Sequence, residues 1–152
     1  MNPSKLKSDL IVENLKDNSH IIIADDDLDD QYIIKDAIEK LNVIHKFTAV
    51  YNGLELIHLL KGTGKTGEKI IPDLIIMDLN MPLLDGMGAL SKIKADEELR
   101  HIPVYILSTS RFDYDKQKAI ELGANDFYSK PFKFEELKNI IKEIYTKTFT
   151  VF

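Results

Sequence analysis

The sequence contains no cysteine, which excludes disulfides, thiolate nucleophiles and cysteine-ligated zinc or iron–sulfur sites. Nor does any apolar run approach the ~18–20 residues that a membrane-spanning helix needs. Residues 1–19 carry charges or amides every few positions and lack the apolar core of a secretory signal. The histidines are scattered, without the short spacing of a metal motif: His20, His45, His58 and His101. We therefore expect a cytoplasmic protein with no histidine-based metal site.

The length and the charge of the chain limit the number of domains and the classes of binding partner. Its 152 residues are enough for one domain, and 44% hydrophobic with 30% charged residues is an ordinary globular composition. The formal net charge is −5 at pH 7. A weakly acidic chain has no general electrostatic reason to bind nucleic acid or an anionic membrane, so we expect neither as a partner.

Short apolar runs alternate along the chain with stretches of helical spacing. Each helical stretch places its apolar residues three and four positions apart. The pattern is strand–helix repeated five times, which favours an α/β fold with a doubly wound, five-stranded parallel sheet and helices on both faces. The predicted strands are His20–Asp25, Lys46–Tyr51, Pro72–Asp78, Pro103–Leu107 and Asp126–Ser129.

Three segments lie outside this repeat. Residues 1–19 carry a weak apolar stripe, which favours a short, loosely packed helix, and residues 61–71 form a loop rich in glycine and lysine. The last residues are β-branched and aromatic. We therefore expect an N-terminal extension at 1–19, the folded domain at 20–147 and a C-terminal tail at 148–152.

Carboxylates crowd the end of the first predicted strand, where the sequence reads DDDLDD. Helix capping and the helix dipole could account for Asp29 and Asp30. They explain Asp25 and Asp26 poorly, because these two directly follow a buried strand. Two carboxylates ~4 Å apart repel by up to ~4 kcal/mol at an effective dielectric near 20. The cluster therefore predicts a divalent, oxygen-seeking cation, with a solvated acidic turn as the alternative.

Reactive side chains also follow the other predicted strands. In a doubly wound sheet the functional site lies at the carboxyl ends of the strands, where Asp78 is expected to converge on the first acidic pair. A carboxylate beside a divalent metal can act as a nucleophile towards a phosphoryl group. Ser108 ends the fourth strand, and Lys130, after the fifth, is suited to neutralise a transferred phosphoryl group. Together these residues predict a phosphoryl-transfer site.

From about His20 to Tyr145, the chain resembles the receiver domain of two-component response regulators, the CheY-like family, in its single-domain form. The resemblance implies a flavodoxin-like (βα)5 fold and phosphoryl transfer from a histidine kinase or a histidine phosphotransfer protein. The domain then changes conformation to control a downstream protein partner, or relays the phosphate. No enzymatic activity is implied beyond Mg²⁺-dependent self-phosphorylation and autodephosphorylation.

The family's marker positions fall on particular residues of this chain. The phosphoacceptor is Asp78, within DLNMPLLDG. The Mg²⁺ ligands are Asp26, Asp78 and the backbone carbonyl of Asn80, with Asp25 acting mostly through water. Lys130, in KPF, is the family's lysine, and its bond to Pro131 is expected to be cis.

The resemblance also implies a switch made of Ser108 and Phe127. After phosphorylation, Ser108 hydrogen-bonds the phosphoryl group, and the aromatic ring of Phe127 turns inward to fill the vacated space. The output surface is expected over the fourth predicted helix (Asp113–Leu122), the fifth strand and the fifth and last helix. A basic and aromatic patch there would dock an acidic partner or a second copy of the chain. This patch comprises Arg111, Tyr114, Lys116 and Lys138.

Other interpretations fit the sequence less well. An interaction module on the same scaffold would work without phosphorylation, although such modules typically lack the acceptor or the lysine. A phosphatase of the haloacid-dehalogenase type would need an acid at position 80, where this chain has Asn80. The Gly64-Lys65-Thr66 stretch resembles the end of a nucleotide-binding loop, but Leu59 stands where that motif needs glycine.

Overall fold

Strands and helices alternate along the whole of the computed structural model, which describes residues 19–41 and 45–149. Each of the five predicted strands is present, within two residues of its expected ends. The strands are β1 (Ser19–Ala24), β2 (His45–Val50), β3 (Leu74–Met77), β4 (Val104–Ser108) and β5 (Asp126–Ser129). The helices are α2 (Leu28–Glu39), α3 (Gly53–Lys61), α4 (Gly86–Ala95), α5 (Asp113–Glu121) and α6 (Phe134–Phe149).

The strands form one parallel sheet in the order β2-β1-β3-β4-β5, which confirms the predicted doubly wound fold. The chain first moves outward from β1 to β2 and then crosses back to β3 on the other side of β1. Ala24 at the end of β1 therefore pairs with Met77 at the end of β3. The reversal of direction lies between these two strands, where a doubly wound sheet opens a crevice at its carboxyl edge.

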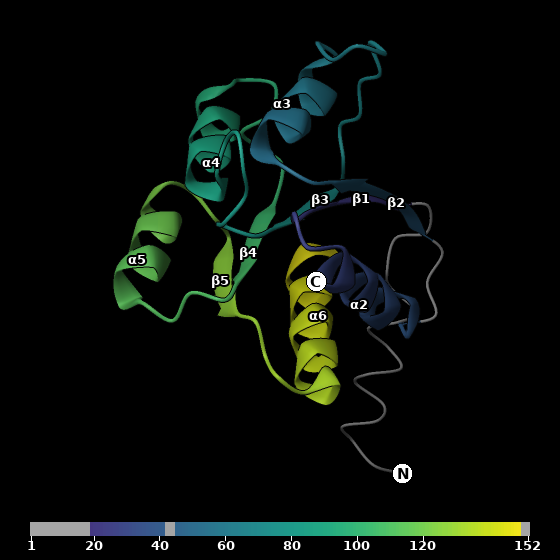
Figure 1. The fold of residues 1–152 in the computed structure, drawn as a ribbon, viewed down its shortest axis with the longest axis vertical. Coiled ribbons are helices and arrows are strands. Elements are labelled where there is room, and N and C mark those ends of the chain that lie inside the picture. The colour runs from purple at the N-terminus through teal and green to yellow at the C-terminus, as the bar shows by residue number, and fades with distance from the viewer. Residues whose placement is uncertain (1–18, 42–44, 150–152) are drawn as a thin grey trace.

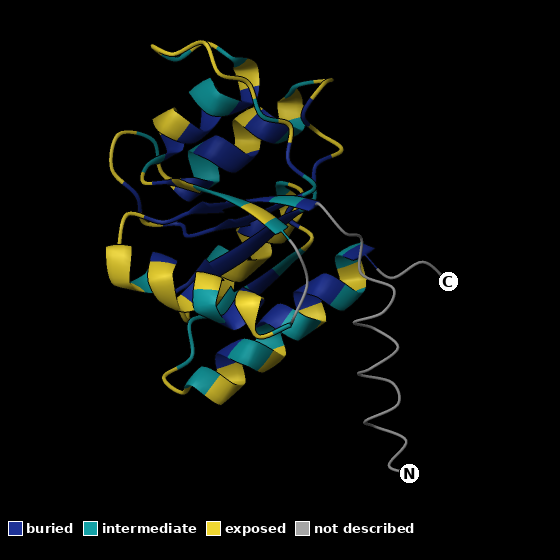
Figure 2. Ribbon diagram, turned by 90° about the vertical axis from the view of Figure 1, so that its right-hand side faces the viewer, coloured by how far each residue is buried: buried dark blue, intermediate teal, exposed yellow. Residues whose placement is uncertain are grey.

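Helices cover both faces of the sheet (Figure 1). One apolar cluster packs α3, α4 and α5 against one face, and a second packs α2 and α6 against the other. All four residues of β3 are buried, as expected for a strand that is covered on both sides. Figure 2 shows the buried sheet between helices whose outer surfaces are exposed.

A few boundaries differ from those that the sequence predicts. The third strand begins at Leu74 rather than Pro72, and the fourth at Val104 rather than Pro103; proline has no N–H to donate to a sheet ladder. The last helix continues to Phe149, whose side chain is buried. The bond between Lys130 and Pro131 is trans, since the described residues contain no cis peptide bond. The expected cis bond is therefore wrong, and the trans form is the usual preference of such bonds.

The N-terminal helix expected within residues 1–19 lies outside the described residues, apart from Ser19, which begins β1. Within the part of the chain that the structure describes, every helix is too short or too polar to cross a membrane.

The start of α4 lies against the end of β3, and a glycine permits this close approach. The N–H of Gly86 donates to the carbonyl of Leu79 at 2.8 Å. A Cβ atom added to Gly86 would lie 2.7 Å from Cα of Leu79 and closer still to the carbonyl oxygen of Asp78, both of which are backbone atoms. Only a residue without a side chain fits at position 86 while α4 begins this close to the end of β3.

We predict that Gly86→Ala lowers the free energy of unfolding by about 2–4 kcal/mol, because the new methyl group displaces backbone rather than a flexible side chain. Gly64→Ala is the control, since its Cβ would meet only the Cβ of His58, at an ordinary 3.5 Å. This control should change the stability by less than about 0.5 kcal/mol in urea unfolding. Equal losses in the two variants would contradict the close packing described for Gly86.

Candidate functional site

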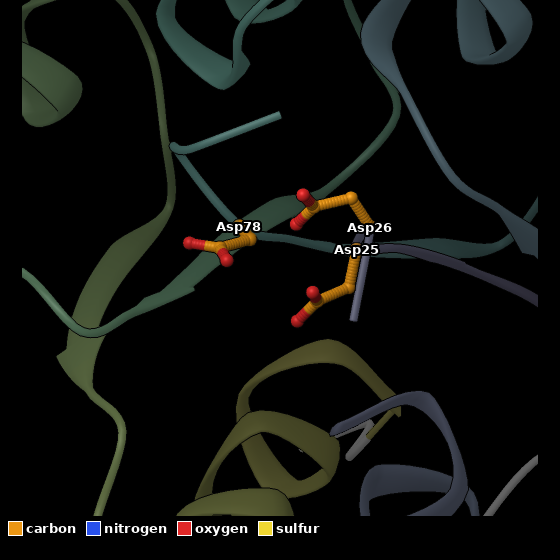
Figure 3. Close-up of side chains that lie close together, drawn as sticks. All are labelled: Asp25, Asp26 and Asp78. Carbon is orange, nitrogen blue, oxygen red and sulfur yellow. The ribbon is translucent and has the colours of Figure 1, made fainter. Parts of the chain in front are cut away.

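The two central strand ends bring Asp25 and Asp78 to the same edge of the sheet. Both residues continue the parallel ladders one step beyond their strands. The N–H of Asp25 donates to the carbonyl of Val50 at 3.0 Å, and that of Asp78 to the carbonyl of Ala24 at 2.9 Å. Their backbones are therefore fixed by the sheet. Figure 3 shows the side chains of Asp25, Asp26 and Asp78 gathered there.

Asp78 is held in one orientation by its own loop. Its Oδ1 accepts hydrogen bonds from the N–H groups of Leu79 at 2.7 Å and Asn80 at 3.4 Å. The other oxygen, Oδ2, lies 3.0 Å from the Nζ atom of Lys130. Only 6% of the Asp78 side chain is exposed. One oxygen of the carboxylate thus accepts hydrogen bonds from the backbone, and the other faces the ammonium of Lys130.

Lys130 connects the carboxylates of several elements. It directly follows β5, and its N–H donates to the carbonyl of Ser108 at 2.7 Å. Its ammonium group lies 2.7 Å from Oδ2 of Asp25 and 2.7 Å from Oδ2 of Asp30, in addition to its contact with Asp78. An ammonium has three N–H donors, so these three carboxylates satisfy all of them.

Sequence reasoning missed Asp30 as part of this network and attributed it to helix capping. In the structure, the cap of α2 is Asp27, whose Oδ1 accepts from the N–H groups of Asp29 and Asp30 at 2.9 and 3.2 Å. The carboxylate of Asp30 instead reaches Lys130. The sequence does hold one signal for this role of Asp30: the residue falls on the first helical turn after β1, close to the strand end that carries Asp25.

Burial and charge act in opposite directions on the ionisable groups of this cluster. Burial raises the pKa of Asp25 to about 6, although its hydrogen bonds with Lys130 and with the N–H of Asp27 oppose the rise. Burial alone would lower the pKa of Lys130, but its hydrogen bonds with Asp25 and Asp30 outweigh this effect and raise it. The ammonium therefore stays charged, and its contact with Asp25 offsets part of the effect of burial on the pKa of that carboxyl.

The cluster retains an excess of negative charge that suits a divalent cation. Asp25, Asp26 and Asp78 each offer a carboxylate oxygen, and these oxygens lie within 4.8 Å of one another. Oxygen-only donors of this kind suit hard cations such as Mg²⁺ or Mn²⁺. Asp26 is exposed, so the group opens to solvent on its side. The carbonyl of Asn80 stays a predicted ligand.

The two predicted switch residues are both buried. Ser108 ends β4, and its Oγ accepts from the N–H of Ser110 at 3.3 Å. Phe127 lies within the apolar cluster that packs α3, α4 and α5 on the sheet, with 6% of its surface exposed. The side chain of Phe127 is therefore buried in this structure, and its inward turn after phosphorylation stays a prediction.

Three residues of the predicted basic and aromatic patch are exposed, and the fourth is paired with an acidic residue. Arg111, Tyr114 and Lys116 are exposed, on α5 and the loop before it. Lys138, on α6, pairs with Glu135 at 3.1 Å, which reduces the positive charge there. The guanidinium of Arg111 lies 5.4 Å from the ring centroid of Phe132.

Comparison with known proteins identifies relatives along most of the chain. The family model of the response regulator receiver domain matches residues 21–142. The probable methanogenesis regulatory protein FilR2 of Methanothrix harundinacea is 33% identical over 127 residues, which cover 82% of this chain and 79% of FilR2.

Solved structures are similar in fold as well as in sequence. The Mn²⁺-bound form of response regulator Rcp1 has a TM-score of 0.80 at 27% identity, over 88% of this chain and 97% of that one; Rcp1 is a protein of Synechocystis sp.. The phosphorylated cyanobacterial phytochrome response regulator RcpA also has a TM-score of 0.80, at 32% identity, over 86% of this chain and 94% of that one.

We predict that Lys130→Met lowers the free energy of unfolding in metal-free buffer, and that the loss depends on pH. Loss of the ammonium raises the pKa of Asp25 further above its unfolded value. Because a raised carboxyl pKa destabilises the fold once the group ionises, the stability loss should grow as the pH rises from about 5 to about 8. We expect a loss of about 2–4 kcal/mol near pH 8 in urea unfolding.

The control for this prediction is Lys133→Met, an exposed position in the same loop. It should change the free energy of unfolding by less than about 0.5 kcal/mol at either pH. A loss for Lys130→Met that is the same at both pH values would contradict the described coupling with Asp25.

Proposed function

The chain belongs to the response regulator receiver domain family, and from this premise we propose that Asp78 is its phosphoacceptor. The phosphoryl donor is a phosphohistidine on a histidine kinase or a histidine phosphotransfer protein. Receiver domains have no catalytic function beyond their own phosphorylation chemistry. The function is therefore signal transfer: phosphorylation of the carboxylate changes which protein the domain binds, or the phosphate is passed on.

One observation carries this proposal: the Nζ atom of Lys130 lies 3.0 Å from Oδ2 of Asp78 at the carboxyl edge of the sheet. In the transfer, an oxygen of Asp78 forms a bond to phosphorus as the bond from phosphorus to the histidine nitrogen breaks. The imidazole leaves with the electron pair of that bond. Lys130 donates a hydrogen bond to a phosphoryl oxygen, where negative charge gathers in the transition state.

The carboxylates of Asp25, Asp26 and Asp78 fit Mg²⁺ as the resident cation. When bound, Mg²⁺ supplies positive charge that offsets the repulsion between the Asp78 carboxylate and the incoming phosphoryl group. Asp25 also orders the turn that leads into α2, because its Oδ1 accepts from the N–H of Asp27 at 2.9 Å. We propose the carbonyl of Asn80 as a further ligand.

Ser108 is the residue that we propose to report the phosphorylated state. Its Oγ already accepts one hydrogen bond from the backbone, so its proton remains to be donated to a phosphoryl oxygen. Such a bond would draw the loop after β4 toward Asp78. Since Phe127 is already buried, the change reaches the surface through this loop, which leads to Arg111 and Tyr114. A downstream protein or a second copy of the chain would bind there.

We predict that wild-type protein incubated with acetyl phosphate and Mg²⁺ gains the mass of one phosphoryl group, whereas Asp78→Asn gains none. The amide has the shape of the carboxylate but lacks its nucleophilic charge. Asp85→Asn is the matched control, because Asp85 caps α4 through the N–H of Gly88 at 2.8 Å and asparagine caps a helix equally well. Labelling of Asp78→Asn at the wild-type rate would contradict the assignment of the acceptor.

A further inference from the structure

Asp30 differs from the other two carboxylates that hold Lys130. Asp25 and Asp78 follow strands, and their side chains are 2% and 6% exposed, whereas Asp30 lies on the first turn of α2 with 32% of its side chain exposed. Its distance from the ammonium is nevertheless 2.7 Å, as short as that of Asp25. One of the three hydrogen bonds of the Lys130 ammonium is thus made to a residue of α2 rather than to a strand end.

Asp30 is also the one partner of Lys130 that lies outside the three-carboxylate group suited to a cation. That group consists of Asp25, Asp26 and Asp78. A bound cation attracts the carboxylates of Asp25 and Asp78, for which it competes with the ammonium, and it also repels the ammonium itself. Asp30 is free of this competition, so its attraction for Lys130 persists when the cation site is filled.

The contact with Asp30 is important because the side chain of lysine is flexible. A flexible four-carbon chain carries the ammonium, which can rotate its donors freely. With Asp25 and Asp30 holding two N–H groups, the third points at Oδ2 of Asp78, 3.0 Å away. Without Asp30, water could replace this contact, and the position of the ammonium would depend on Asp25 alone.

We infer that Asp30 is a positioning residue for phosphoryl transfer: it holds the Lys130 ammonium so that one N–H faces the phosphoryl group on Asp78. This inference rests on the proposed function, since it assigns a role within that reaction. Asp30 touches Lys130 rather than the reacting atoms, so its whole effect on the reaction passes through this lysine.

The test compares Asp30→Ala and Asp29→Ala, each in the wild-type and the Lys130→Met background. Asp29 is exposed on the same helical turn, so its loss controls for the helix dipole. The rate of phosphoryl uptake from acetyl phosphate is measured at saturating Mg²⁺, where changes in cation affinity have no effect. Asp30→Ala should slow uptake by about 10- to 100-fold when Lys130 is present and by less than about twofold when it is absent. Asp29→Ala should stay within about twofold in both backgrounds.

A second readout follows the ammonium itself. In nitrogen-15 NMR, the Lys130 ammonium should exchange slowly with water in the wild type and in Asp29→Ala, and distinctly faster in Asp30→Ala.

The outcomes separate this inference from the proposed function. Absence of phosphoryl uptake by the wild type would overturn the proposed function. If the wild type is phosphorylated, unchanged uptake in Asp30→Ala would overturn only the role of Asp30. Equal slowing with and without Lys130, or unchanged exchange of the ammonium, would show that Asp30 acts on the fold rather than through this lysine.

Discussion

The contact of one partly buried ammonium with three carboxylates is the interaction on which this site depends. Lys130 joins the end of β5 to the ends of β1 and β3 and to the first turn of α2. Without it, buried carboxylates would face one another with little solvent to screen their repulsion. Because Asp26 adds a fourth carboxylate, one ammonium cannot neutralise the cluster. The remaining negative charge makes the same residues suited to a divalent cation.

The parallel sheet makes this concentration of charge possible. Its ladders continue one residue past β1 and β3, so the backbones of Asp25 and Asp78 are held by Val50 and Ala24 rather than by a flexible loop. The apolar clusters on both faces fix the strands themselves. The hydrogen bonds and the packing of the whole domain thus keep like charges close together. The carboxylates therefore still repel one another, and a bound cation or a phosphoryl group changes this repulsion.

Much of this arrangement could be predicted from the sequence, because strand ends follow directly from apolar runs. The run before Asp78 and the run before Asp25 are long enough to define neighbouring strands. The role of Asp30 could not be predicted, since it depends on how α2 sits relative to the loop after β5. Nor could the burial of Phe127 in this structure, which depends on how α3, α4 and α5 pack against the sheet. The sequence predicts a tail from residue 148 onward, yet α6 continues to Phe149, whose ring centroid lies 5.2 Å from that of Tyr145.

The most direct test of the account is the stability of the protein in Mg²⁺, compared with NaCl at equal ionic strength. At Mg²⁺ ten times its dissociation constant, the wild type should gain about 1.4 kcal/mol of unfolding free energy, which corresponds to a rise of roughly 3–6 °C in Tm. Asp26→Ala should lose most of this gain, whereas Asp29→Ala should keep it. An equal gain in both variants, or none in the wild type, would contradict a cation site built from the carboxylates at these strand ends.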